Sequence, residues 1–336
     1  MGTRIAIFGA GAIGCWVGGR LAAGGAEITL IGRTRVMDEV RGGLRVTQLA
    51  GPDADVTVTA TTEVAAAAAA ELVIVTVKSA QTAEAGAQLA RVLPPGAVVV
   101  SLQNGVRNAD VLRGALPDRR VLAGMVPWNV VRRAAGAYHR ASQGTLMIED
   151  DPAGLALVHA CAAAGLAIEP RRDMPAVQWG KLVMNLNNAI NALSGLPLAT
   201  ELSQRGFRRC LAAAQREALG SLAAANIAVA RLTAIPPRLM PSLLTLPDAL
   251  FTRLARRVIA IDPHARSSMW DDLEAKRPTE IDDLQGEIVA LAARVGRAAP
   301  VNRALVALVR AAEAGGKRDY AGAELYAALG LGPAVT

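Results

Sequence analysis

The feature of this chain that most constrains its fold is a glycine-rich turn at residues 9–14, with the sequence GAGAIG. A short apolar run, RIAIF at residues 4–8, precedes the turn and has the composition of a buried parallel strand. Residues 13–23 follow the pattern of a helix, and EITLI at residues 27–31 has the pattern of a second strand. This order predicts a Rossmann-like β-α-β unit at the start of the chain.

The spacing of the three glycines in the turn suits the binding of a dinucleotide. Gly9 permits the tight bend out of the strand, Gly11 lets a pyrophosphate approach the backbone, and Gly14 allows helix and strand to pack closely. The N–H groups at the helix start, from Ala12 and Ile13, would face the same anion. We predict these five residues as cofactor contacts; the alternative is a glycine-rich turn that binds no ligand.

The residues after the second strand indicate which nicotinamide cofactor is bound. An acid at this place would bind the ribose 2′-hydroxyl, whereas an arginine accommodates a 2′-phosphate. The sequence here is IGRTR at residues 31–35 and contains no carboxylate. We predict NADP(H) as the cofactor, with Arg33 as the main phosphate contact and Arg35 as a helper. The alternative is two solvated loop arginines.

Two further predicted strands end in polar residues. Residues 71–77 (ELVIVTV) lead into Lys78, and residues 97–102 (AVVVSL) lead into Asn104. Ligands of open α/β sheets lie beyond the carboxyl ends of the strands. Lys78 could meet an anionic group of the substrate or cofactor, and Asn104 could bind the substrate or the nicotinamide end. Each also has an ordinary interpretation, as a surface lysine and a turn-forming Asn-Gly pair.

Two later runs, residues 121–128 and 144–148, also have the pattern of strands. We expect both to extend the sheet in the antiparallel direction. From residue 174 onward the pattern becomes helical, with few runs typical of strands. We therefore predict an α/β fold with an N-terminal NADP-binding Rossmann-like domain at residues 1–173. An all-helical C-terminal domain at residues 174–336 would carry the substrate and catalytic residues.

One predicted helix of the C-terminal half, residues 175–193, carries a polar row. Lys181, Asn185 and Asn188 fall on one face at about 100° per residue. Burying an amine and two amides without partners would be costly, so they should meet something polar. A bound substrate is one answer, and a hydrogen-bond network between helices is the other.

A second group of polar residues lies nearer the C-terminus. Ser268 begins the run SMW, and Thr279 looks like a helix N-cap with Asp282 in the capping-box position. Glu280 would lie in the first turn, where the helix dipole favours an acid without any catalytic role. The proline-rich stretch at residues 235–263 interrupts the helices and is expected to be a loop with short helices.

Composition limits the other classes of function. The chain has 336 residues, 52% of them apolar, a net charge of +7 and three separated cysteines. The basic charge is mostly scattered arginine with no nucleic-acid-reading motif, so we expect no nucleic-acid partner. No apolar run reaches the length of about 20 residues that a membrane helix needs. The cysteine and histidine spacings favour neither a disulfide framework nor a metal site, and a reduced, cytoplasmic setting is expected.

Taken together, these residues resemble the ketopantoate reductase (2-dehydropantoate 2-reductase) family over nearly the whole chain. The shared features are the glycine turn, Arg33, Lys78, the QNG turn at residues 103–105, the WGKLVMN helix at residues 179–185, Ser268 and the TEID run at residues 279–282. Their order and spacing are together more specific than any one of them.

The resemblance implies that NADPH reduces the ketone of ketopantoate to pantoate, on the way to pantothenate and coenzyme A. It implies a site in the cleft between the two domains. Lys181 would be the general acid, and Glu280 would hydrogen-bond the substrate hydroxyl and hold Lys181 in place. Asn185 would bind the substrate and Ser268 its carboxylate, while Asn104 and Lys78 would line the cofactor side. The expected partner is a small-molecule 2-oxo acid, and a homodimer is compatible with the sequence.

Two departures from the family pattern bear on the substrate. The family commonly has a second asparagine four residues after Asn185, where this chain has Ala189. Asn188 and Asn191 lie nearby, and Asn188 is favoured because it shares the Lys181 face. The chain is also longer than compact family members around residues 231–264. The alternatives are a reductase of another branched 2-oxo acid, an opine or 3-hydroxy-acid dehydrogenase, and a non-enzymatic NADPH-binding protein.

Overall fold

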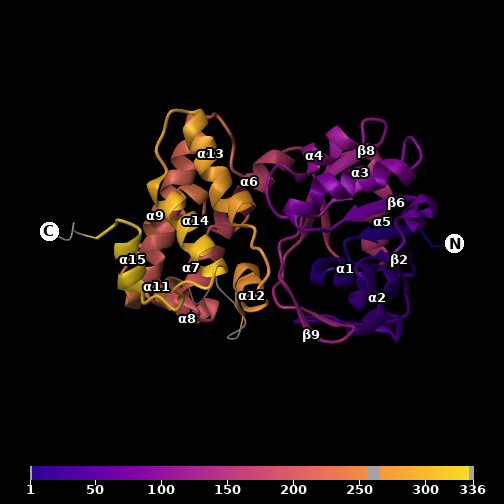
Figure 1. The fold of residues 1–336 in the computed structure, drawn as a ribbon, viewed down its shortest axis with the longest axis horizontal. Coiled ribbons are helices and arrows are strands. Elements are labelled where there is room, and N and C mark those ends of the chain that lie inside the picture. Colours follow the sequence, from indigo (N-terminus) through magenta and orange to yellow (C-terminus); the bar gives the residue numbers. More distant parts are fainter. Residues whose placement is uncertain (1, 256–264, 333–336) are drawn as a thin grey trace. The chain divides into compact units, whose positions relative to one another are not determined.

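A computed structural model describes residues 2–255 and 265–332 of the chain. The chain divides into two compact units, Met1–Met174 (unit 1) and Pro175–Thr336 (unit 2). Unit 1, coloured from indigo to magenta, is built on β-sheets with flanking helices, and unit 2, coloured from pink through orange to yellow, is built on helices (Figure 1). The predicted fold class, a Rossmann-like unit followed by a helical one, is confirmed.

Unit 1 contains an eight-stranded sheet in the order β12-β11-β8-β7-β6-β1-β2-β5. The first two predicted strands are confirmed with the expected ends, and β1 pairs in parallel with β2 on one side and β6 on the other. The strands of this sheet are β1 (Arg4–Phe8), β2 (Glu27–Ile31), β5 (Thr59–Thr61), β6 (Leu72–Val75), β7 (Val98–Ser101), β8 (Arg120–Met125), β11 (Leu146–Glu149) and β12 (Ile168–Arg171).

Alternate residues of β1 face two separate hydrophobic cores, because successive side chains of a strand point to opposite faces. Ile5 and Ile7 belong to a core that also contains residues of α1 (Ala12–Ala23) and α5 (Leu155–Ala163). Ala6 and Phe8 belong to the other core, with residues of α3 (Thr82–Val92) and α4 (Asn108–Ala115). Both faces are covered, which explains why the strands are almost continuously apolar.

The direction of β8 differs from the expectation. β8 pairs in parallel with β7, whereas β11 pairs with β8 in the antiparallel direction that we predicted for both. Helix α4 lies between β7 and β8 in the sequence and carries the chain back across the sheet. A crossover helix of this kind returns the chain in the same direction, so the strands it joins are parallel.

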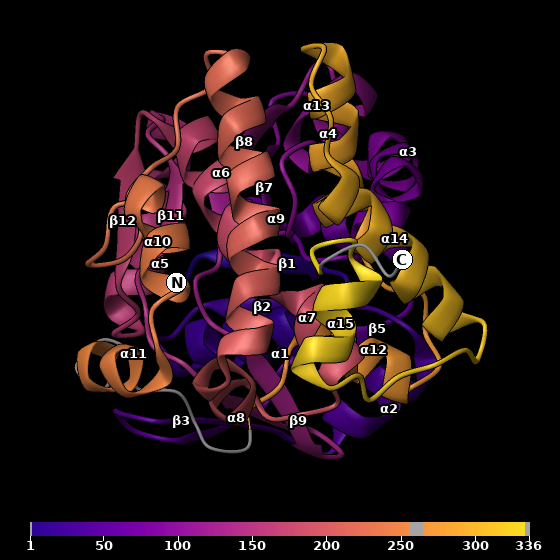
Figure 2. The ribbon, with the colours of Figure 1, turned by 90° about the vertical axis from the view of Figure 1, so that its left-hand side faces the viewer.

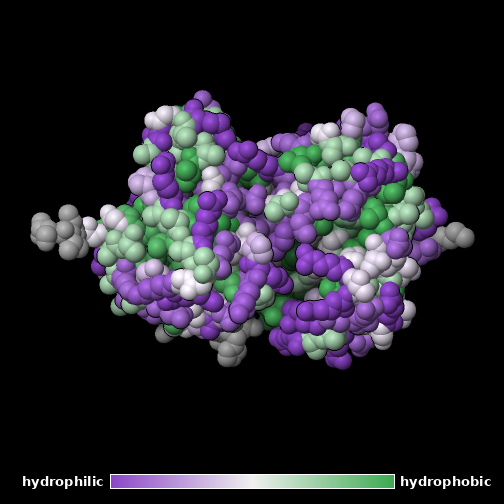
Figure 3. All heavy atoms as spheres, viewed as in Figure 1, coloured by the Kyte–Doolittle hydropathy of each residue, from purple (hydrophilic) through white to green (hydrophobic). Residues whose placement is uncertain are grey.

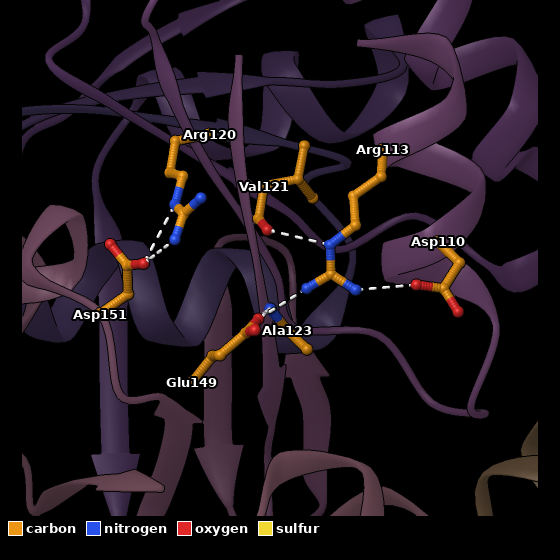
Figure 4. A network of polar contacts seen from close by, with 7 residues as sticks. All are labelled: Asp110, Arg113, Arg120, Val121, Ala123, Glu149 and Asp151. Carbon is orange, nitrogen blue, oxygen red and sulfur yellow. Dashed lines mark hydrogen bonds and ion pairs between the residues drawn. The ribbon is translucent and has the colours of Figure 1, made fainter. Parts of the chain in front are cut away.

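A network of polar side chains lies beside β8, where the pairing of the sheet changes from parallel to antiparallel (Figure 4). The Glu149 carboxylate accepts the backbone N–H of Ala123 at 3.0 Å and a guanidinium N–H of Arg113 at 2.6 Å. Arg113 also donates to Asp110 at 2.7 Å and to the carbonyl of Val121 at 3.3 Å. Where the short β8–β11 ladder ends, side chains of α4 and β11 therefore hydrogen-bond to the backbone groups of Val121 and Ala123 in β8.

Unit 1 has a second, four-stranded sheet that the sequence patterns did not predict. Its order is β4-β3-β10-β9, formed by β3 (Leu44–Gln48), β4 (Ala54–Val56), β9 (Val130–Ala134) and β10 (Ala137–Arg140). These strands are short, and exposed arginines interrupt their apolar pattern. The sheet packs on α1, where Trp16 and Trp128 meet edge to face with ring centroids 5.6 Å apart.

Unit 2 packs its helices around the long helix α9, which runs through the unit between α10 and the pair α13 and α14 (Figure 2). Its helices are α6 (Met174–Asn185), α7 (Asn187–Ser194), α8 (Leu198–Ser203), α9 (Arg205–Ala224), α10 (Met240–Leu244), α11 (Asp248–Ala255), α12 (Ser268–Glu274), α13 (Glu287–Arg294), α14 (Pro300–Glu313) and α15 (Gly322–Ala328). Unit 1 also contains the α-helix α2 (Thr34–Arg41).

The predicted single helix at residues 175–193 is wrong, because Leu186 interrupts it and separates α6 from α7. Two buried glutamines from other elements donate to backbone carbonyls at this interruption. The side-chain amide of Gln285 donates to the carbonyl of Leu186 at 2.8 Å, and that of Gln215 donates to the carbonyl of Val183 at 3.3 Å. Inserted side-chain donors of this kind are a known cause of helix bends.

The proline-rich stretch has the expected form where it is described. A short 3-10 turn (Pro237–Leu239) leads into α10, and α11 follows. Residues 256–263 of the stretch lie outside the described residues. In the described parts of the chain, no helix is both long enough and apolar enough to cross a membrane. Hydrophilic side chains cover much of the face drawn in Figure 3, with apolar areas between them.

Candidate functional site

The glycine turn after β1 has the geometry that the sequence predicted. Gly9 has a φ of +102°, and a Cβ built there would lie 2.7 Å from the backbone nitrogen of Val77. The hydroxyl of Thr76 donates to the carbonyl of Gly9 at 2.6 Å and anchors the turn to the segment after β6. A side chain at residue 9 would be both strained and overlapping, so only glycine suits this bend.

The other two glycines of the turn differ in their surroundings. A Cβ on Gly14 would lie 2.5 Å from the Thr76 hydroxyl, so this glycine is needed for packing. Gly11 is exposed, and the nearest atom to a Cβ there would be 4.0 Å away. It is the N-cap of α1, whose first turn carries no acid and no side-chain cap. The turn therefore leaves an open approach to a helix N-terminus, which fits a pyrophosphate.

The arginines after β2 are in different environments. Arg33 is exposed, and its guanidinium has no hydrogen bond or ion pair within residues 2–255 and 265–332. The guanidinium of Arg35 lies 3.3 Å from the carboxylate of Glu39, and the guanidinium of Arg132 lies 2.7 Å from the same carboxylate. Arg33 is thus available for a 2′-phosphate, whereas the predicted helper Arg35 already has a carboxylate partner.

The structure brings together the two loops that carry Lys78 and Asn104. β6 ends at Val75 and β7 at Ser101, and these two residues are paired neighbours in the parallel sheet. Lys78 and Asn104 each lie three residues beyond their strand, and the hydroxyl of Ser79 donates to the carbonyl of Asn104 at 3.4 Å. Both predicted residues therefore lie at the carboxyl edge of the sheet, where ligands of this fold bind.

In unit 2, Lys181 lies on α6 with a half-buried side chain. Burial lowers the pKa of its amine from the ordinary value of 10.5 to about 8, because the charged form loses hydration. Desolvation is the cause of this shift, and within the described residues the Lys181 amine has no ion pair. An ammonium with a pKa near 8 is well suited to give up a proton at neutral pH.

The asparagines of α6 and α7 fall into two classes. Asn191 is fully buried, and its amide donates to Glu201 at 2.8 Å and to the carbonyl of Leu196 at 2.9 Å. Its side-chain oxygen accepts the N–H of Ser267 at 2.8 Å, so its hydrogen-bonding groups are used inside unit 2. Asn188 is only half-buried and Asn185 is 8% exposed. Of the two replacements considered for the family asparagine, Asn188 remains the better placed.

The segment before α12 attaches to α7 next to these asparagines. Ser267 is the N-cap of α12, and its hydroxyl donates to the carbonyl of Asn188 at 3.1 Å. Ser268, the predicted carboxylate contact, is the first residue of α12 and is half-buried. The structure thus brings Ser268 near Asn188, although 80 residues of sequence separate them.

The predicted capping box at residues 279–282 is wrong in its second half. The hydroxyl of Thr279 accepts the N–H of Ile281 at 3.3 Å, as an N-cap does. The N–H of Thr279, however, donates to Glu313 at 2.7 Å, and Asp282 accepts from Arg310 at 2.6 Å. Glu280 is 8% exposed and precedes a π-helical turn, Asp282–Gly286, which is a rare feature that often marks functional sites.

Sequence patterns missed two residues that support this site. Thr76 anchors the glycine turn, and the only sequence signal is a hydroxyl residue in an otherwise apolar strand end. Gln285 joins the turn after Glu280 to the α6–α7 interruption, and nothing local to its sequence marks that role. The three cysteines are free and buried. The described residues contain no group of three or more His, Cys, Asp or Glu that could hold a metal ion.

Comparison with known families gives two matches that follow the two units. Residues 5–152 match the family described as "Ketopantoate reductase PanE/ApbA", and residues 173–313 match its C-terminal domain, "Ketopantoate reductase PanE/ApbA C terminal". A curated 2-dehydropantoate 2-reductase from Halobacterium salinarum is 30% identical over 324 residues, covering 93% of this chain and all of the relative.

Solved structures show the same fold. A PanE/ApbA family ketopantoate reductase from Ralstonia eutropha JMP134 is 31% identical, with a TM-score of 0.80 over 93% of this chain and 99% of the other. D-mandelate dehydrogenase, solved with NADH and anilino(oxo)acetate, is 19% identical with a TM-score of 0.79 over 93% of this chain and 99% of the other. At this identity the second likeness concerns the fold alone.

Proposed function

This chain belongs to the ketopantoate reductase family, and we propose that it reduces 2-dehydropantoate to pantoate with NADPH. The observation that carries the proposal is Lys181, an amine on α6 whose pKa burial lowers to about 8. An amine in this state can protonate an oxyanion at neutral pH. The curated relative that matches this chain along its own full length is a 2-dehydropantoate 2-reductase.

The residues of unit 1 fit the cofactor. The open backbone at Gly11 and the first turn of α1 would hold the pyrophosphate, and Arg33 would hold the 2′-phosphate. Lys78 and Asn104, at the carboxyl edge of the sheet, would line the nicotinamide end. When bound, NADPH supplies a hydride to the carbonyl carbon of a 2-oxo acid.

Lys181 would act on the oxygen of the same carbonyl group. Its ammonium charge would stabilise the negative charge that develops there, and its proton would pass to that oxygen to give the hydroxyl of the product. The amine would be left neutral and would regain its proton from solvent before the next turnover. Since desolvation weakens the hold of the amine on its proton, the same burial that lowers the pKa makes the transfer easier.

The polar residues of unit 2 would bind the substrate. Asn185 and Asn188 flank the interruption between α6 and α7, and Ser268 begins the helix whose N-cap bonds to Asn188. We assign the substrate carboxylate to Ser268 and the substrate hydroxyl to Glu280. A carboxylate beside the hydroxyl hydrogen of a substrate is a favourable, charge-assisted contact.

A second candidate function is the reduction of another branched 2-oxo acid by the same chemistry. The observation that favours it is Ala189, which stands where the family commonly has asparagine and is fully buried. An alanine there offers no hydrogen bond to a substrate hydroxyl. A site that lacks one such bond discriminates less against substrates that lack the hydroxyl.

The test is NADPH oxidation, followed optically with ketopantoate and with a panel of 2-oxo acids with and without a second hydroxyl. We expect ketopantoate to give the highest kcat/KM. Lys181→Ala should lower kcat by about 10²- to 10⁴-fold with the NADPH Kd nearly unchanged. Lys276→Ala, at an exposed lysine of the same unit, is the matched control and should leave kcat unchanged. Unaltered turnover in Lys181→Ala would exclude the mechanism.

A further inference from the structure

A network of buried polar side chains lies beneath the two loops that carry Lys78 and Asn104. Thr82 is the first residue of α3 and Asn108 is the first residue of α4, so each begins the helix that follows one loop. Gln103 lies between them in the sequence, two residues after the end of β7. Thr82 is 1% exposed, Asn108 is 6% exposed and Gln103 is 7% exposed. Water therefore cannot easily take the place of a hydrogen-bond partner that one of these side chains loses.

The bonds of this network form a continuous chain. The amide of Gln103 donates to the Thr82 hydroxyl at 2.7 Å and to the carbonyl of Val77 at 3.1 Å. The Thr82 hydroxyl in turn donates to the side-chain oxygen of Asn108 at 2.7 Å. The hydroxyl of Ser101 donates to the side-chain oxygen of Gln103 at 2.9 Å, which completes the bonding of that amide.

The chain ends on the backbone of Asn104. The side-chain amide of Asn108 donates to the hydroxyl of Ser79 at 3.0 Å and also to the carbonyl of Asn104. The Ser79 hydroxyl donates to that same carbonyl at 3.4 Å. Gly105 follows in the left-handed region, with a φ of +84°. The carbonyl of Asn104 is thus held by two donors, Ser79 and Asn108. The backbone of Asn104, from which its side chain departs, is therefore held by groups that lie behind the loop.

The completeness of the network distinguishes it from several other buried amides of the chain. No buried polar atom of Thr82, Gln103 or Asn108 lacks a partner, whereas the side-chain oxygens of Gln215 and Gln285 have none in the described residues. A fully bonded buried network rigidifies the segments that it joins, while a partly bonded one mainly costs stability. This network joins the loop that carries Lys78 to the loop that carries Asn104, and both are predicted site residues.

We propose that Thr82 and Asn108 are positioning residues that hold the Asn104 side chain in the orientation needed to bind the nicotinamide end or the 2-oxo acid. The role rests on the proposed function, since Asn104 must contact a ligand for its orientation to matter. Thr82 is the pivot, because its single hydroxyl accepts from Gln103 and donates to Asn108. Neither residue touches the reacting atoms; each acts through the backbone of Asn104.

The first experiment removes only the pivot hydroxyl. Thr82→Val keeps the volume and shape of the side chain, and we expect kcat/KM for ketopantoate to fall by about 10- to 30-fold. Thr82→Ser restores the hydroxyl and should return kcat/KM to within about threefold of the parent. Thr47→Val is the matched control, because Thr47 also makes a partly buried hydrogen bond in unit 1, to His139 at 2.7 Å. We expect Thr47→Val to leave kcat/KM unchanged.

A double-mutant cycle with Asn104→Ala separates positioning from general stability. If Thr82 acts through Asn104, then Thr82→Val should lower kcat/KM no further once the Asn104 side chain is gone. An equal loss in both backgrounds would overturn the proposal. An equal loss in Thr82→Val and Thr47→Val would overturn it as well, because both would then report only the loss of folded protein.

Hydrogen exchange follows the network without any turnover. Thr82→Val should speed the exchange of the Asn104 and Gly105 amides, and Thr47→Val should not. Faster exchange with an unchanged kcat/KM would overturn the positioning role and leave the proposed function intact. A wild-type chain that reduces no 2-oxo acid would instead refute the proposed function, and unchanged exchange in Thr82→Val would separately refute the network.

Discussion

Glu201 on α8 is a fully buried carboxyl group, and its titration should make the stability of unit 2 depend on pH. One carboxyl oxygen accepts the amides of Asn191 at 2.8 Å and Asn187 at 3.3 Å, and the other has no partner in the described residues. Burial raises the pKa from the ordinary value of 4.5 to about 8, and the two amides offset this only in part. At neutral pH the group is therefore protonated in the folded protein and ionised in the unfolded chain.

The sign and size of the effect follow from these two pKa values. Below pH 4.5 both the folded and the unfolded state hold the proton, so the titration of Glu201 gives the free energy of unfolding no dependence on pH. As the pH rises toward 8, the unfolded chain binds fewer protons than the folded protein, and the free energy of unfolding falls. Each pH unit in this window is worth about 1.4 kcal/mol, so the loss approaches about 5 kcal/mol above pH 8.

The perturbation that tests this reasoning is Glu201→Gln, which keeps the shape of the protonated group and removes the titration. We expect similar stability for the variant and the parent at pH 5, and a variant that is several kcal/mol more stable at pH 9. The assay is urea unfolding of unit 2 at a series of pH values, since the midpoint reports stability when the slope is unchanged. A variant-minus-parent difference that stays constant between pH 5 and pH 9 would refute the buried, protonated state.

Glu217→Gln is the matched control for this experiment. The Glu217 carboxylate accepts the N–H groups of Val301 at 2.8 Å and Asn302 at 3.0 Å, and the Asn302 side-chain amide at 2.8 Å. A glutamine cannot accept with both of its terminal groups, so one N–H donor would face another. The same substitution should therefore destabilise unit 2 at neutral pH by about 1–3 kcal/mol.

Three further predictions concern Arg33, the proposed acid Lys181 and the glycine turn. Arg33→Ala should raise the NADPH Kd by about 10- to 100-fold and change the NADH Kd much less, by fluorescence titration; equal effects on both would contradict a 2′-phosphate contact. The kcat/KM of the parent should fall as the pH rises through about 8, because Lys181 must be protonated to act as the acid, and a flat profile up to pH 9 would exclude that role. Gly14→Ala should destabilise unit 1 by about 1–3 kcal/mol in thermal unfolding, because its Cβ would lie 2.5 Å from the Thr76 hydroxyl. Gly11→Ala, with open space around its Cβ, should leave stability unchanged and weaken NADPH binding, and the reverse order of the two effects would contradict the assigned roles.

Candidate residues that depend on a strand or turn could be predicted from the sequence, because their signals are local. The apolar runs at β1 and β2 and the glycines between them place the turn at the carboxyl end of β1. Lys78 and Asn104 follow from the same reasoning, since each comes within two residues of the end of an apolar run. The direction of β8 could not be predicted in this way, because α4, the crossover helix before it, is only eight residues long.

Helix interruptions and buried networks were beyond the sequence, because they depend on contacts between distant segments. Residues 175–193 have a continuous helical pattern. The side-chain donors that meet the interruption come from Gln215, 32 residues after Val183, and from Gln285, 99 residues after Leu186. The capping box failed for the same reason, since Glu313 on α14 reaches the Thr279 N–H in place of Asp282. A local pattern cannot report a competing partner that is far away in the chain.

The sequence by itself determined the Rossmann-like start, the candidate NADP(H) preference of Arg33 and the change to helices after residue 174. These depend on backbone freedom at glycine and on periodicities of two and 3.6 residues, which short segments carry. Only the tertiary structure decided that the side chain of Asn191 is hydrogen-bonded inside unit 2, unlike that of Asn188. It also decided that Thr82 and Asn108 lie behind Asn104. Whether a buried polar group is used or available depends on which other segments fold against it, and three-dimensional packing alone decides that.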